Sequence, residues 1–241
     1  MIKFFRHIRK SLLMETGKTG KYFKYAIGEI ILVVIGILIA LSINNWNTIR
    51  LEKNEEVKLL TDMRSEFKKN LKLLSEYDIV RIDTVLNNQD YLINYNDLNK
   101  TNNLSIAFQK AFKHPTWNPS LMILDDLKNS GKLSKISNNH LKQSLYNWYS
   151  FYTDYLEDIK VSEISYQNLL SYTLNNGIYF DLMTSINSGN LSKHKQLVEL
   201  LLKDKIFMSF LINYNQVVLI RKKEYLDAQN IIKEIIKESN N

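Results

Sequence analysis

One apolar stretch near the N-terminus constrains this chain more than any other feature. Residues 26–43 contain only two polar side chains, Glu29 and Ser42, and the run Ile30–Leu41 contains none. A membrane-spanning helix needs about 20 consecutive, mostly apolar residues. The sequence therefore predicts a transmembrane helix, which we assign to residues 25–47.

Charge is distributed unevenly around this stretch. Residues 1–24 hold seven Lys or Arg and one Glu, so they supply +6 of the total formal charge of +7. Basic residues mark the cytoplasmic side of a membrane helix. We therefore expect a bacterial inner-membrane protein that crosses the bilayer once, with a cytoplasmic segment at 1–24 and a periplasmic domain at 48–241. Because the basic excess lies outside that domain, the pattern argues against a nucleic-acid partner.

Aromatic residues flank the apolar stretch on both sides. Tyr22 and Tyr25 precede it and Trp46 follows it, as anchors at the two membrane interfaces do. Tyr25 and Trp46 are separated by about 32 Å of helix, which matches the thickness of a bilayer core. The lipid bilayer is thus the first expected partner.

A cleavable secretory signal is the alternative interpretation. Ala40-Leu41-Ser42 has the small residues of a cleavage site. However, the 24 residues before the apolar stretch are long for a signal peptide, and the pattern continues to Trp46 without a break. We therefore favour an uncleaved anchor, and both interpretations export the large domain.

The remainder of the chain has a helical pattern throughout. The sequence has two prolines, seven glycines and no cysteine, which favours long helices and excludes disulfides. We predict an all-α fold in which the transmembrane helix continues into an antiparallel helical bundle. The expected helices are 48–98, 104–113, 121–130, a helix capped by Ser137 and running to 174, 191–203 and 204–238. Residues 178–186 fit either a short extended piece or a helical turn.

Individual capping residues indicate where some of the helices begin and end. Ser120 is the expected N-cap of the helix at 121–130, and Gly131 and Gly177 are expected to end helices. Residues 2–14 suit either an interfacial helix or a disordered basic tail. Residues 15–24 are expected to form a hinge.

Several motifs resemble those of a known family. The segments that carry the resemblance are Met1–Arg6, Tyr25–Ile30, Leu32–Ala40 and Ile43–Asn47, and more loosely Ser130–Leu133 and Ile136–Leu141. Together they resemble an uncharacterised family of single-pass membrane proteins found mainly in Bacteroidota. The resemblance implies an inner-membrane anchor with a periplasmic helical domain, and it implies no activity, ligand or catalytic residue.

One face of the predicted transmembrane helix carries polar and small residues. Glu29, Gly36, Ala40 and Asn44 recur at helical steps. The pair Gly36 and Ala40 lets helices approach closely, which predicts a homo-oligomer or a membrane-protein partner. Glu29 has three interpretations: it reaches the cytoplasmic interface, it bonds across helices, or it carries a proton.

Aromatic residues also cluster later in the chain. Trp148, Tyr152 and Tyr155 lie on one helical face, where they form either part of the core or a ligand pocket. The four histidines are scattered without metal-ligand spacing, and no nucleophile or phosphate-binding motif is present. We therefore predict no enzyme activity, no metal and no cofactor.

Three functions remain open. The first is a non-enzymatic scaffold or sensor that associates through its membrane helix. The second is a subunit of an ion-coupled membrane complex that uses Glu29. The third is a periplasmic ligand-binding domain built around the aromatic helix.

Overall fold

A computed structural model describes residues 19–96 and 104–240, apart from the side chains of residues 19–22 and 24. Every regular element in these ranges is a helix, and no strand occurs in them. This confirms the predicted all-α fold. The chain divides between Lys58 and Leu59 into two units. The segment expected at 2–14 lies outside the described residues.

The first long helix, α2 (Thr19–Leu73), is 55 residues long. Its start shows that the hinge expected over 15–24 is wrong from Thr19 onward. The predicted continuation from the apolar stretch into the following helix is confirmed. Met63 and Phe67, near its C-terminal end, are buried, so a single helix supplies both the apolar stretch and part of the bundle core.

The helix expected over 48–98 is interrupted by a π-helical turn and ends early, at Ile93. A π-helical turn, η1 (Leu74–Asp78), separates α2 from α3 (Ile79–Ile93). A π-turn adds a residue to one turn and rotates the following face. Leu74 and Ile82 are both buried on this path, so the apolar stripe stays on the bundle side across the turn.

Two short helices follow, α4 (Leu104–Ala111) and α5 (Met122–Asn129), and then the 3₁₀ turn η3 (Lys132–Lys135). The Ser120 N-cap is wrong, because Leu121 occupies that position without a side-chain hydrogen bond. Instead the Glu66 carboxylate of α2 accepts from the N–H groups of Met122 at 2.9 Å and Ile123 at 3.0 Å. A residue from another helix thus satisfies the first turn of α5.

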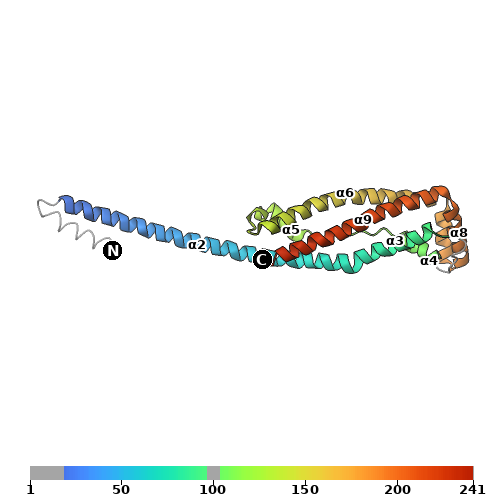
Figure 1. The fold of residues 1–241 in the computed structure, drawn as a ribbon, viewed down its shortest axis with the longest axis horizontal. Helices are drawn as coiled ribbons and strands as arrows, with labels where there is room; N and C mark the ends of the chain where they lie inside the picture. The colour runs from blue at the N-terminus through green and yellow to red at the C-terminus, as the bar shows by residue number, and fades with distance from the viewer. Residues whose placement is uncertain (1–18, 97–103, 241) are drawn as a thin grey trace. The chain divides into compact units, whose positions relative to one another are not determined.

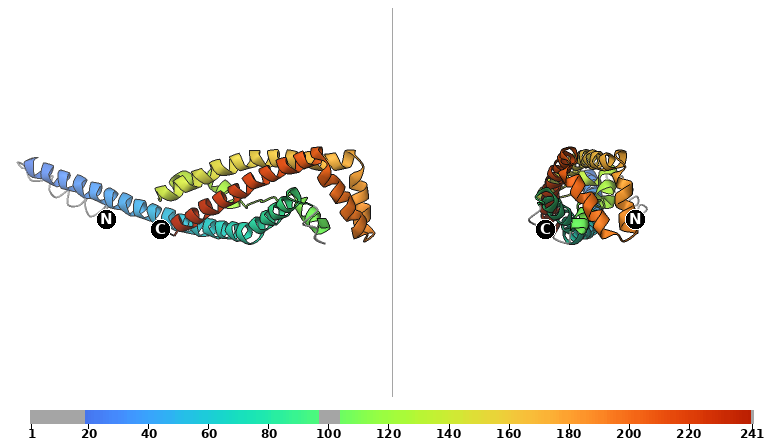
Figure 2. Two further views of the ribbon diagram at one scale, coloured as in Figure 1. Left: turned by 45° about the vertical axis from the view of Figure 1, so that its right-hand side comes forward. Right: turned by 90° about the vertical axis from the view of Figure 1, so that its right-hand side faces the viewer.

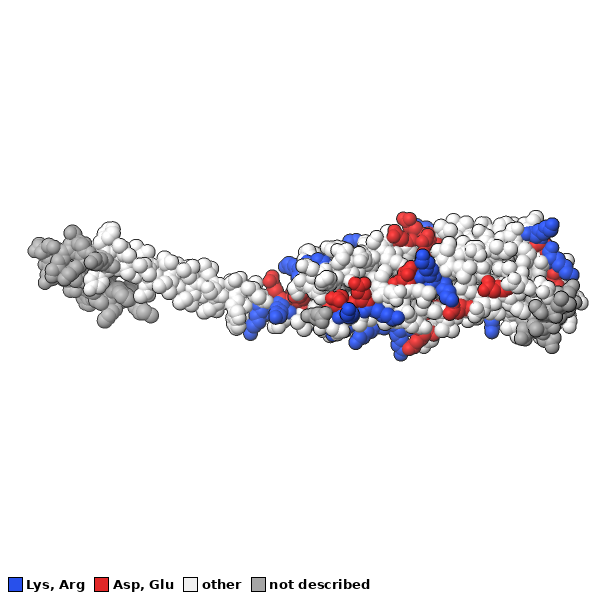
Figure 3. Space-filling model, viewed as in Figure 1, with Lys and Arg blue, Asp and Glu red and all other residues white. Residues whose placement is uncertain are grey.

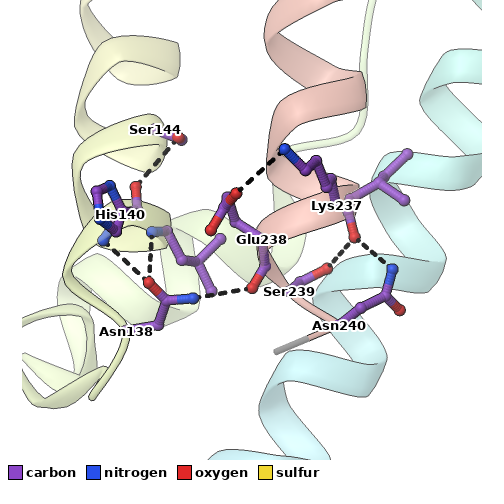
Figure 4. A network of polar contacts seen from close by, with 9 residues as sticks. Asn138, His140, Ser144, Lys237, Glu238, Ser239 and Asn240 are labelled. Carbon is purple, nitrogen blue, oxygen red and sulfur yellow. Dashed lines mark hydrogen bonds and ion pairs between the residues drawn. The ribbon is translucent and has the colours of Figure 1, made fainter.

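The longest helix of the bundle is α6 (Asn139–Asn175). Asn138 caps it in place of Ser137: its Oδ1 accepts from the N–H groups of His140 at 2.9 Å and Leu141 at 3.1 Å. Figure 4 shows that the amide nitrogen of Asn138 also donates to the Glu238 carbonyl at 3.0 Å. The amide of Asn138 makes both kinds of hydrogen bond through separate atoms, because its oxygen accepts and its nitrogen donates.

The chain ends with α7 (Ile178–Asn187), α8 (Leu191–Lys203) and α9 (Lys205–Glu238). The ambiguous segment 178–186 is therefore helical. Gly131 and Gly177 follow α5 and α6 with φ values of 70° and 74°, which confirms both as helix terminators, because the left-handed region strains other residues.

The unit at 59–241 is a bundle of long helices. Figures 1 and 2 show α9 between α6 and α3, antiparallel to both, with α7 and α8 at one end. Residues 112–121 carry no helix and pass through this bundle. Pro115 and Pro119 explain the gap, because proline removes an N–H group and disfavours a helical conformation in the residue before it. Trp117 of this segment is buried.

Candidate functional site

The apolar stretch is the first candidate site. Among the described residues, α2 is the helix that is long and apolar enough to cross a membrane, and its most apolar window is entirely exposed. Figure 3 shows this stretch without Lys, Arg, Asp or Glu on the face in view. Exposed aliphatic surface of this extent is stable inside a bilayer and costly in water.

The predicted association face is exposed, and it is open at Gly36. Glu29, Gly36, Ala40 and Asn44 are exposed. A Cβ atom added at Gly36 would meet nothing within 4 Å. Small residues on an open face leave room for a second helix, so the geometry is compatible with association.

The structure describes the side chains of two of the three predicted interface anchors. Tyr25 and Trp46 are exposed, whereas the Tyr22 side chain lies outside the described residues. The Arg50 guanidinium lies 5.5 Å from the centre of the Trp46 ring and donates to the Asn47 side chain at 3.0 Å. The polar residues after the apolar stretch thus form local contacts along one helix.

The predicted aromatic site lies inside the bundle. Trp148 is 0% exposed and meets Phe67 and Trp117 edge to face at 5.5 and 6.0 Å. Tyr155 is buried, and Tyr152 is half-buried against the core. This packing is that of core residues, and a ligand pocket at this position stays a prediction.

Tyrosine hydroxyls hold the proline-containing segment in place. Tyr214 donates to the Lys113 carbonyl and Tyr155 to the Trp117 carbonyl, each at 2.8 Å. Tyr225 lies 3.5 Å from the Pro115 carbonyl. Segment 113–117 makes no helical hydrogen bonds of its own, so these side chains satisfy carbonyls that burial would otherwise leave unpaired.

A buried arginine lies beside these tyrosines. Arg221 of α9 is 1% exposed, and its Nη2 donates to the hydroxyls of Tyr155 at 3.0 Å and Tyr225 at 3.3 Å. Its Nε and Nη1 make no hydrogen bond. Burial raises the pKa of both tyrosines, while the Arg221 charge opposes that rise. Among the residues that the structure describes, no carboxylate forms an ion pair with this buried cation.

An acidic residue one turn further along α9 is also perturbed. Burial, together with a hydrogen bond to Asp158 and the charge of that residue, raises the pKa of Glu224 to about 8. Its Oε2 is buried without a hydrogen bond. Glu224 is thus protonated in much of the population at neutral pH.

A cavity of about 420 Å³ lies between α3 and the segment at 110–115. Its lining residues are Val80, Arg81, Thr84, Val85, Lys110, Lys113, His114 and Pro115. The lining is basic at some positions and apolar at others, without an acidic residue. We call this cavity the basic pocket.

His114 forms a fixed wall of the basic pocket. Its ring stacks on Tyr166 at 5.1 Å, and its Nδ1 lies 3.1 Å from the Tyr214 hydroxyl. That hydroxyl gives its own proton to the Lys113 carbonyl, so Nδ1 is the donor. Burial first, and then the Arg221 charge, lower the pKa of His114. The neutral form of the ring is therefore favoured more than in an ordinary histidine.

Among the described residues, no group of three or more His, Asp or Glu side chains is placed to hold a metal ion. No known catalytic signature accompanies the helical fold over residues 19–96 and 104–240. Sequence reasoning missed Arg221, Glu224 and the basic pocket. The sequence does mark Arg221 as unusual, because it lies on the same apolar face of the helix as Tyr214, Val218 and Tyr225, where a charged residue is rare.

A family model described as "Family of unknown function (DUF6090)" matches residues 29–214. This chain belongs to the DUF6090 family. The DUF6090 match includes Glu29, most of the apolar stretch and every residue of the basic pocket, and it ends before Arg221. No curated protein and no solved structure matches the chain.

Proposed function

We propose that this chain is a single-pass membrane protein whose helical bundle acts as a non-enzymatic interaction or sensor domain. Residues 25–47 span the inner membrane, with residues 1–24 in the cytoplasm and 48–241 in the periplasm. One observation carries the proposal: α2 is continuous from an entirely exposed apolar stretch to the buried residues Met63 and Phe67. A helix that is apolar all round suits lipid, whereas one with a single apolar stripe suits a protein core.

The orientation is tested with reporter fusions. Alkaline phosphatase, which is active only outside the cytoplasm, is fused after Asn241 in one strain and after Lys24 in another. The proposal expects activity from the first fusion and none from the second, because positive charge retains the N-terminus inside. The reverse pattern, or recovery of the full-length fusion in the soluble fraction, overturns it.

Association through the membrane helix is the second part of the proposal. The open face at Gly36 and Ala40 supports it. Crosslinking in native membranes is expected to give oligomers that Gly36→Leu reduces, because the larger side chain keeps two helices apart. Gly28→Leu is the matched control, since Gly28 lies about 80° away around the helix. Monomers alone in the unmodified protein, or equal loss in both variants, overturn this part.

A subunit of an ion-coupled complex is the second candidate function. It is favoured by one observation, a carboxylate within the exposed apolar part of α2 at Glu29. An ionisable residue at such a position is costly and marks function by default. The test compares a strain carrying Glu29→Gln with a gene deletion. A deletion phenotype that Glu29→Gln does not reproduce removes this candidate.

A further inference from the structure

The basic pocket has a charge that its surroundings do not cancel. Arg81, Lys110 and Lys113 line it. Asp78 lies 3.7 Å from the Arg81 guanidinium and offsets that one charge in part. The next carboxylate on α3, Asp83, is held by Lys222 at 2.7 Å. In the described part of the chain, neither lysine of the pocket forms an ion pair, so the cavity keeps a net positive charge.

A buried arginine extends the positive charge of the pocket into the bundle interior. Arg221 lies close enough to His114 for its charge to lower the pKa of that histidine, and this effect exceeds the opposing effect of the Glu163 charge. It is 1% exposed, and two of its nitrogens lack hydrogen-bond partners. A charge in the protein interior is screened less than one in water. The buried Arg221 charge therefore makes the wall behind the pocket electropositive.

Apolar side chains form the rest of the pocket. Val85 is 2% exposed and Pro115 is buried, whereas Val80 is 55% exposed. Lys110, Lys113 and Arg81 are exposed. The charges thus lie near the solvent side and the buried apolar atoms lie deeper. A ligand that matches both parts has an acidic group at one end and an apolar body at the other.

We propose that the basic pocket binds a small organic anion. Its carboxylate lies among Arg81, Lys110 and Lys113 near solvent, with Val80 at the exposed edge, and its apolar body contacts Val85 and Pro115. A volume of about 420 Å³ accommodates a molecule of this kind. The inference goes beyond the proposed anchoring and association, because direct binding requires neither orientation nor oligomer.

The first test measures binding of two matched probes to the full-length protein in zwitterionic nanodiscs. The ¹⁹F NMR signal of 4-fluorobenzoate reports the anion, and 4-fluorobenzamide is its neutral counterpart. The proposal expects benzoate to bind at least about tenfold more tightly than the amide, and to weaken as salt rises. Equal affinities, or no benzoate binding up to about 10 mM, overturn the proposal.

Substitutions then locate the site. Lys110→Gln and Lys113→Gln are each expected to weaken benzoate binding about two- to fivefold, and the double variant about tenfold, because exposed charge pairs have modest energies. Lys160→Gln on α6 is the matched control and is expected to leave binding unchanged. An equal effect of all three substitutions indicates non-specific attraction and overturns the proposal.

A second pair of variants keeps the test independent of the lysines. Val80→Asp adds a carboxylate at the exposed edge of the pocket, and Val80→Asn has nearly the same shape without the charge. The aspartate is expected to weaken benzoate binding about tenfold relative to the asparagine, because like charges repel. Equal binding by the two variants contradicts the proposal. Displacement of benzoate by an equal concentration of inorganic phosphate also overturns the apolar part, since phosphate has no apolar body.

Discussion

Two regions of this molecule contain similar residues and use them in opposite ways. From Tyr25 to Lys58, α2 exposes almost every side chain, including Trp46 at 64%. In the bundle, Trp148 is 0% exposed. The apolar residues of α2 surround the helix between Ile30 and Leu41, whereas those of α6 and α9 recur on one stripe. The spacing of apolar residues, more than their number, separates a membrane segment from a bundle helix.

The largest expected difference between the two regions comes from their tryptophans. Trp148→Ala removes a side chain packed on Phe67 and Trp117, so the free energy of unfolding of the bundle is expected to fall by about 3–5 kcal/mol. Trp46→Ala is expected to change it by less than about 0.5 kcal/mol. Urea titration in detergent, followed by near-UV circular dichroism, measures both. Similar losses in the two variants would break the comparison.

The stability of the bundle, unlike that of the apolar stretch, is expected to depend on pH through the half-buried Glu224. Burial raises the folded-state pKa of Glu224 from 4.5 to about 8, so the folded state binds this proton more tightly than the unfolded state. The contribution of Glu224 to the free energy of unfolding is fully present below about pH 4.5 and is lost as the pH rises toward 8. We expect a loss of about 2 kcal/mol, less than the full shift would give because the side chain still meets solvent.

Glu224→Gln is expected to flatten this dependence, because glutamine has no proton to lose. Thermal unfolding of both proteins in steps from pH 4.5 to 8.5 gives the measurement. The variant is expected to be the more stable of the two at pH 8. Parallel pH profiles for the two proteins would show that another group is responsible.

The C-terminal part of α2 belongs to the bundle, and Glu66 tests this. Glu66→Ala removes the acceptor for the N–H groups of Met122 and Ile123. A lost cap of this type costs about 1–2 kcal/mol. Ser120→Ala loses only its hydroxyl contact with Glu66 and is expected to cost less. Hydrogen exchange at Met122 and Ile123 separates the variants, and a larger effect of the serine change would contradict the assigned cap.

The smallest expected difference is between two glycines. Gly131 has a φ of 70°, so Gly131→Ala is expected to destabilise the bundle by about 1 kcal/mol. Gly36 lies in a helical stretch with open space around it, so Gly36→Ala is expected to leave the bundle unchanged. Melting temperatures in detergent are sufficient for this test. A loss at Gly36 would mean that the two units are not independent in stability.

Local patterns predicted most of the helices. The helix at 191–203 has the expected limits, and the one expected from 204 begins at Lys205 with Asp204 as its cap. These boundaries depend on residues within one turn of the helix end. The errors at Ser120 and Ser137 have a common cause. The sequence contains a serine suited to each cap, but in the folded chain the first N–H groups of the two helices donate to Glu66 and to Asn138 instead.

The sequence alone determined that this chain is helical, that one stretch is apolar all round, and that the helix continues into a domain. Those properties repeat every few residues, so neighbours along the chain specify them. Tertiary structure alone decided where Arg221 lies, which carbonyls the tyrosines meet, and that Arg81 and Lys113 share one cavity. The Tyr214 hydroxyl and the Lys113 carbonyl are 101 positions apart. Contacts at such separations depend on how helices pack, and no periodic pattern in the sequence encodes them.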